Sequence, residues 1–151
     1  MKYKSIDALG EFQFSDSPIL DSECNSNSLK FQLANVTILA SNTNNRDIMD
    51  MRTNDLILTF EDATITSFIA EGYKVYDANN NLTESVADEP FSKENYAQII
   101  HNLSEATIYS IEEISNNQCV INMDIVPEMR TYSLTLSYSH SIAQWDRFLK
   151  K

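Results

Sequence analysis

Two histidines are the residues of this chain best suited to acid–base or metal chemistry. His101 and His140 lie far apart in the sequence, and neither has a neighbour at the spacing used by zinc-protease motifs. A histidine without such neighbours is more often a surface or helix-end residue than a catalytic one. We therefore expect His101 on a helix surface and His140 near a helix cap, and whether either joins a site in space is a question for the structure.

Residues 77–81 (DANNN) place side-chain oxygens at alternate positions, as a calcium-binding loop does. Leu82 stands where such a loop needs glycine, and Asp88 stands where it needs a bidentate glutamate. The segment also follows residues with strand character. We therefore predict a hairpin turn that is stabilised by hydrogen bonds of its Asp and Asn side chains, and no metal site.

Other catalytic arrangements are missing from the sequence. Gly10 and Gly72 are its two glycines, too few for a phosphate-binding loop, and no serine lies in a G-x-S-x-G elbow. Paired carboxylates such as Glu112 and Glu113 are adjacent, so on a strand they point to opposite faces and do not flank one scissile bond. We therefore expect neither an enzyme nor a cofactor.

Charge narrows the range of partners. The 22 acidic residues outnumber the 11 basic ones, which gives a net charge of -11. Such a surface repels phosphate backbones and anionic membranes and attracts basic proteins, so we expect a basic protein partner, no nucleic acid and no membrane. Residues 1–12 lack the apolar stretch of a signal peptide, and Cys24 and Cys119 are too few for a disulfide scaffold. These features predict a cytoplasmic protein with reduced thiols.

Alternating apolar and polar residues predict most of the structure as strands. The alternation is clearest over residues 131–139 and over residues 118–125, with a break at 126–129 between them. Residues 106–114 are rich in β-branched side chains and precede an asparagine-containing turn sequence. These three segments predict a meander within a single domain, residues 1–151.

The first half of the chain is less regular. Strands are predicted over residues 56–60, 64–70 and 73–76, and a change of parity near Asn35 predicts a bend in the strand that begins at Leu29. The polar stretch at residues 15–28 has no convincing period, so we predict a surface loop there.

Two segments carry helical patterns. Ser92 as N-cap predicts a helix over residues 92–103. Ser141 and Gln144 have the spacing of a capping box, and the apolar residues after them fall on one stripe, which predicts a second helix over residues 141–150. The fold class is therefore predicted as α+β, with a predominantly antiparallel sheet of about nine strands, meander or sandwich-like, and two helices.

Surface carboxylates and tyrosines are the candidate contacts for a basic partner. Carboxylates offer charge complementarity, and tyrosine offers a large contact area with a polar tip. Two ordinary explanations compete: an acidic surface keeps a protein soluble, and any single tyrosine can serve sheet packing. The candidate partner-binding residues are Asp16, Asp21, Glu61, Asp62, Tyr73, Tyr76, Asp88, Glu89, Glu112 and Glu113.

As a whole, this small, acidic chain without catalytic motifs resembles the immunity proteins that bacteria make against polymorphic or contact-dependent growth inhibition toxins. The resemblance is one of type and covers Met1–Lys151, through the segments 54–60 (NDLILTF), 72–77 (GYKVYD) and 145–148 (WDRF). It implies a cytoplasmic protein that binds one cognate toxin domain, such as a nuclease, and neutralises it by covering its active site or blocking substrate entry.

Two other functions fit the same sequence. One is a structural or regulatory scaffold that binds another protein but no toxin. The other is a small enzyme or ligand carrier, which predicts a deep pocket that gathers His101 or His140 with carboxylates.

Overall fold

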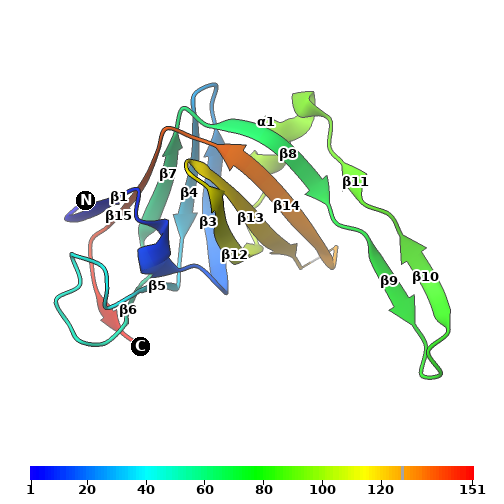
Figure 1. Ribbon diagram of the computed structural model, residues 1–151, viewed down its shortest axis with the longest axis horizontal. Helices are drawn as coiled ribbons and strands as arrows, with labels where there is room; N and C mark the ends of the chain where they lie inside the picture. The colour runs from blue at the N-terminus through cyan, green and yellow to red at the C-terminus, as the bar shows by residue number, and fades with distance from the viewer. Residues whose placement is uncertain (127) are drawn as a thin grey trace.

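The computed structural model describes residues 1–126 and 128–151, and most of them lie in antiparallel strands (Figure 1). The described part contains sixteen strands, more than the nine expected, because many are very short. In chain order the elements are β1 (Tyr3–Ile6), η1 (Leu9–Glu11), β2 (Phe12–Gln13), β3 (Ser17–Cys24), β4 (Ser28–Leu33), β5 (Val36–Ile38), β6 (Met51–Thr53), β7 (Leu56–Glu61), β8 (Thr64–Ala70), β9 (Tyr73–Tyr76), β10 (Leu82–Val86), β11 (Glu89–Pro90), η2 (Lys93–Asn95), α1 (Tyr96–His101), β12 (Ala106–Ser115), β13 (Gln118–Ile125), β14 (Arg130–Ser137), β15 (His140–Trp145) and β16 (Leu149–Lys150).

Ten strands form one sheet in the order β1-β15-β7-β4-β3-β12-β13-β14-β8-β11. The predicted meander is confirmed as β12, β13 and β14, with Cys119 opposite Leu136 in the central pairing. The break between β13 and β14 is also where it was expected, although Pro127 within it lies outside the described residues. The chain neighbours β7 and β8 lie near opposite ends of the strand order, and their inward side chains belong to one hydrophobic cluster.

The core follows directly from the alternation in the sequence. Leu134 and Leu136 of β14 are fully buried, as are Leu58 and Phe60 of β7, while the residues between them are partly exposed. The ring of Phe60 packs against Tyr138, with 5.0 Å between the ring centroids. Burying one face of these strands is the main favourable term in folding.

The predicted helix over residues 141–150 is wrong: this segment forms β15 and β16. Ser141, Ala143 and Trp145 are buried, which is the period of a strand, and β15 is paired on both sides, with β1 and with β7. Non-local pairing therefore overrides a local pattern that also fitted a helical stripe. No capping box forms, because Ser141 donates its backbone N–H to the Asp7 carboxylate, 2.9 Å away.

The predicted loop at residues 15–28 is also wrong, because most of it forms β3. Its buried positions include Ser17, Ile19 and Ser22, so two of the three carry hydroxyls and the alternation is hard to see in the sequence. The buried hydroxyl of Ser22 donates to the backbone oxygen of Ile100 in α1, which satisfies both groups and attaches the helix to β3.

The predicted helix at residues 92–103 exists in shortened form as η2 followed by α1, and Ser92 makes no side-chain cap hydrogen bond. Phe91 and Tyr96 both pack on Phe68 of β8, with ring centroids 4.9 and 5.7 Å away. The predicted bend is confirmed at Asn35, whose φ is 54°. It sends the chain from β4 into a separate sheet of order β16-β6-β5-β2.

Candidate functional site

Strands β9 and β10 form a two-stranded arm that projects from the body of the protein (Figure 1). The arm is antiparallel, with Tyr73 opposite Val86 and Tyr76 opposite Leu82. Residues 77–81 make its tip, where the Asp77 carboxylate accepts the backbone N–H groups of Asn79 and Asn81 at 2.8 and 2.9 Å. The predicted hairpin turn with its side-chain hydrogen bonds is therefore confirmed.

The arm exposes large apolar side chains. Tyr76 and Leu82 are each 54% exposed, and Tyr73 and Val75 are each 40% exposed. Paired residues share a face, so Tyr73, Val75 and Val86 lie on one face while Tyr76 and Leu82 lie on the other. A two-stranded ribbon with no core of its own is only marginally stable in water. Single exposed apolar side chains are common on protein surfaces, but a cluster of them usually marks a binding surface.

Gly72 permits the close crossing at the root of the arm. A Cβ atom built on Gly72 would lie 2.7 Å from the carbonyl carbon of Ala87 and 2.8 Å from the backbone nitrogen of Asp88. No side chain fits at that separation without a shift of backbone. Asp88 also accepts the Gly72 N–H through its carboxylate, at 2.6 Å. Both strands of the arm are thereby held together where they leave the sheet.

Arg130 fixes the root of the arm to β14. Its guanidinium donates to the backbone oxygens of Ala70 and Glu71 at 3.3 and 3.1 Å, and it lies 5.8 Å from the ring centroid of Tyr73. A looser ion pair joins it to Glu89, at 3.8 Å. The arginine side chain is 17% exposed, so these contacts are partly shielded from water. The arm therefore leaves the body in a defined direction.

The arm is acidic. Between residues 71 and 89 the chain carries five carboxylates and one lysine. The backbone N–H of Asn81, together with that of Asn79, lowers the pKa of Asp77 below its ordinary value, against a smaller opposing effect of burial. The carboxylates of this segment are Glu71, Asp77, Glu84, Asp88 and Glu89.

Four of the ten predicted partner-binding residues meet at this arm: Tyr73 and Tyr76 on β9, Asp88 at its root and Glu89 on β11. Exposed tyrosines and carboxylates are thus combined on one element, as a protein interface requires. The sequence prediction missed Val75, Leu82 and Arg130. The β-branched residues Thr83 and Val86 were the available signal for β10, whereas the role of Arg130 depends on the sheet order.

Glu61 and Asp62 lie at the opposite end of β8 from the arm, beside His140 and Asp7. His140 Nδ1 is 2.7 Å from an Asp7 oxygen, and this hydrogen bond raises the pKa of His140. Burial pushes the pKa of Asp7 upward, but the hydrogen bonds from His140 and from the Ser141 backbone outweigh it and leave the Asp7 pKa lowered.

In the described part of the chain, the two histidines lie on different elements and neither belongs to a group of three possible metal ligands. His140 is on β15 rather than near a helix cap, and His101 is exposed at the end of α1. Within residues 1–126 and 128–151, no three His, Cys, Asp or Glu side chains are grouped so as to hold a metal ion.

The other four predicted residues are scattered. Asp16 has a positive φ of 62° in the turn before β3, and Asp21 lies on β3, where it accepts the backbone N–H of Ser22 at 2.9 Å. Glu112 and Glu113 are exposed on β12. The structure does not bring these four carboxylates to the arm.

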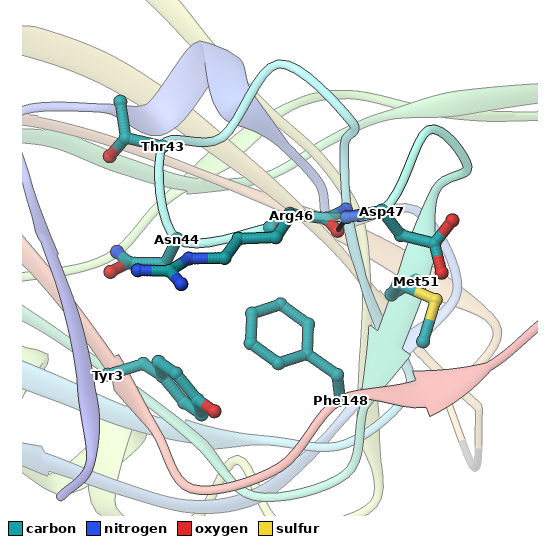
Figure 2. A pocket seen from close by; sticks show the side chains of 8 residues that line it. Tyr3, Thr43, Asn44, Arg46, Asp47, Met51 and Phe148 are labelled. Atoms are coloured by element: carbon teal, nitrogen blue, oxygen red, sulfur yellow. Dashed lines mark hydrogen bonds between the residues drawn. The ribbon is translucent and has the colours of Figure 1, made fainter.

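A cavity of about 460 Å³ lies near the chain termini, at the far end of the molecule from the arm (Figures 1 and 2). The rings of Tyr3 and Phe148 form one wall and meet edge to face, with 4.7 Å between their centroids. The Arg46 side chain crosses the opposite side of the cavity (Figure 2). Asp47 lines this cavity but neither His101 nor His140 does, so it does not gather the histidine with carboxylates that the enzyme alternative predicts.

Arg46 lines this cavity, and other basic residues are close in sequence to its lining residues. Seven of the eleven basic residues are within three positions of a residue that lines it. Basic residues are therefore more frequent in the segments that line the cavity than in the arm, which carries one lysine. These seven residues are Lys2, Lys4, Arg46, Arg52, Arg147, Lys150 and Lys151.

The chain matches no family model, no curated protein and no solved structure. Among the residues that the structure describes, no helix has both the length and the apolar character needed to span a bilayer.

Proposed function

We propose that this chain is a protein-binding domain that contacts a basic partner protein through the arm, residues 71–89. One observation carries the proposal: the arm projects from the body with its apolar side chains exposed on both faces and five carboxylates around them. Tyrosines with a surrounding polar rim are the usual anchors of protein interfaces.

The partner is expected to be basic because of how charge is distributed. The arm carries one lysine against five carboxylates, while seven of the eleven basic residues lie within three sequence positions of a residue that lines the cavity. A positively charged surface is therefore attracted to the arm and turned toward it during approach, which speeds association. Binding of this kind weakens as salt screens the charges.

The partner class that we propose is a bacterial toxin domain, such as a nuclease, with this chain as its cytoplasmic immunity protein. A nuclease holds phosphates on a basic surface, and the carboxylates of the arm are chemically suited to occupy that surface in place of phosphate. The acidic composition and the type resemblance support this proposal. Neutralisation would follow from covering the active site or closing the entry of its substrate.

The second candidate function is a structural or regulatory scaffold, in which the same arm binds a protein that is not a toxin. The identity of the protein encoded beside this chain separates the two proposals, as does a pull-down from the native cell. A toxin partner loses its activity when bound, whereas the partner of a scaffold keeps its own activity.

The test is co-purification of this chain with the toxin domain encoded beside it. The double variant E71K/E84K reverses two charges of the arm, and E112K/E113K makes the same change on β12, away from the arm. We expect the first variant to lose the complex at physiological salt and the second to keep it. Free elution of both wild-type proteins, or equal loss with the two variants, would contradict the proposal.

A further inference from the structure

Strand β9 has an outer edge that is open to solvent. Among the described residues, β9 pairs with β10 on one side and belongs to a sheet of two strands. All four residues of β9 are exposed. An open edge offers unpaired backbone N–H and C=O groups to any other extended chain.

The other sheet edges in the described part of the chain are shorter, interrupted or already partly hydrogen-bonded to a side chain. β11 has two residues and contains Pro90, while β16 and β2 also have two residues each. β10 is interrupted by a register shift between Leu82 and Glu84. β1 has the same length as β9, but its Lys4 backbone oxygen already accepts the side-chain amide of Asn44 at 2.9 Å. Short length, proline, bulges and charge are the devices by which natural sheets prevent strand addition. β9, in contrast, has a regular backbone and exposes the side chains of Tyr73, Val75 and Tyr76. It contains one lysine.

The outward backbone groups of β9 belong to Lys74 and Tyr76. Asp77 donates its N–H to the Asn81 oxygen at 2.9 Å, and the Val75 oxygen accepts the Thr83 hydroxyl at 3.1 Å, so both residues point toward the β10 side. In an antiparallel pair, alternate residues direct their N–H and C=O groups to opposite sides of the strand. Lys74 and Tyr76 therefore present theirs to the free edge.

We infer that the partner completes the arm by adding one of its own strands to the free edge of β9. This inference rests on the proposed function and specifies how the partner is held. Two-stranded ribbons become independently stable once a third strand and an apolar face are added. Strand addition also supplies affinity through the backbone and leaves specificity to the side chains on either face.

The arm defines the side chains of the added strand. Glu71 precedes β9 and Asp77 follows it, so each end of the strand has a carboxylate. Glu84 of β10 lies opposite Val75 and adds a third carboxylate on the face that Val75 shares. A complementary strand carries lysine or arginine at both ends and apolar or β-branched residues between them, next to Val75 and Tyr76. A second copy of this chain is a poor occupant, because two arms would set their carboxylates against one another.

The first experiment uses a synthetic peptide with lysine at each end and alternating valine and threonine between. We expect it to bind the full-length protein and to slow hydrogen exchange at the amides of Lys74 and Tyr76. Tyr73 and Val75 amides, which face β10, are the internal reference. Binding without protection of Lys74 and Tyr76, or equal binding of a peptide with glutamate at its ends, would overturn the inference.

The second experiment compares K74P with K74A. Both variants remove the lysine charge, but K74P also removes the outward N–H while leaving the ladder to β10 intact. We expect K74P to bind the peptide about tenfold more weakly than K74A, as loss of one interfacial hydrogen bond predicts. Nuclear Overhauser contacts between Tyr73 and Val86 check that the arm of K74P is still paired. Equal affinity of the two variants would refute strand addition.

Failure of this inference can be separated from failure of the proposed function. A toxin domain that co-purifies with K74P but not with the double variant Y76S/L82S would bind the faces of the arm and not its edge, which overturns strand addition alone. A toxin domain that co-purifies with all of these variants would overturn both.

Discussion

The guanidinium of Arg130 lies 5.8 Å from the ring centroid of Tyr73, and this contact joins the central meander to the projecting arm. Arg130 belongs to β14 and Tyr73 to β9, so the pair ties the first exposed residue of the arm to the third strand from one end of the ten-stranded sheet. The same guanidinium donates to the carbonyl groups of Ala70 and Glu71. The direction of the arm is thus set from inside the body.

Replacing Arg130 by alanine is expected to lower the free energy of unfolding by about 2 kcal/mol, because hydrogen bonds from a charged donor to two carbonyl oxygens are lost. Glu89→Gln is the matched control, since its carboxylate is 69% exposed. An exposed ion pair contributes less than about 1 kcal/mol, so this variant should be close to wild type. Urea unfolding measures both. A larger effect for Glu89→Gln would show that the ion pair dominates this contact.

Gly72→Ala should destabilise the protein by about 1–3 kcal/mol, because the added methyl group forces the backbone at Ala87 and Asp88 to move. Gly10→Ala provides a control with the same chemical change, since a Cβ at Gly10 meets nothing within 4 Å. That variant should stay within about 0.5 kcal/mol of wild type. Denaturant midpoints compare the two, and an equal response at both glycines would contradict the close crossing at the arm's root.

The pair of Asp7 and His140 should stabilise the fold over a limited range of pH. The raised pKa of His140 gives a contribution that is present below the ordinary histidine value of 6.5 and is lost as pH rises through the folded value. The lowered pKa of Asp7 gives a second stabilising contribution. It is present above the ordinary aspartate pKa of 3.8 and is lost as pH falls through the pKa that Asp7 has in the folded protein. The contribution of the pair is therefore greatest between 3.8 and 6.5.

His140→Gln tests this range. The stability difference between wild type and His140→Gln should be largest within it and should shrink on both sides. Titration of the His140 ring by NMR gives the folded pKa directly. A difference that does not vary with pH would mean that His140 acts through packing and not through its charge.

The two cysteines should differ in reactivity. Cys119 is fully buried, and burial, with the charge of Glu113 nearby, raises its pKa to about 12, so almost none of it is thiolate at neutral pH. Cys24 is partly exposed, although burial raises its pKa as well. In the native protein, a thiol reagent should therefore modify Cys24 alone, and slowly. In denaturant it should modify both Cys24 and Cys119. Rapid modification of Cys119 in the native state would show that β13 opens easily.

The parts of the fold that were predicted correctly are those in which local pattern and tertiary environment agree. Residues 118–125 and 131–139 alternate large apolar and polar side chains, and both strands bury one face. β3 was missed because two of its buried positions are serines, Ser17 and Ser22, whose hydroxyl groups find acceptors within the fold. Burial of a satisfied hydroxyl leaves little trace in a hydrophobic pattern.

The second helix was mispredicted for a different reason. Over residues 141–150 the apolar spacing fits a helical stripe and a strand about equally, and the choice is made by β1 and β7, which come from distant parts of the chain. Sequence periodicity carries no information on which strands are available to pair. The same limit applies to the site: tyrosines and carboxylates were recognised as candidate contacts, but their collection on a projecting arm depends on sheet order.

The two ends of the arm leave the body as neighbours, because Glu89 pairs with Ala70 across β8 and β11. A segment that departs from and returns to one point on a sheet can be lengthened, shortened or exchanged without moving the strands beneath it. Evolution can thus change the binding preference of this protein by replacing residues 73–86 alone, while the sheet beneath them keeps its sequence.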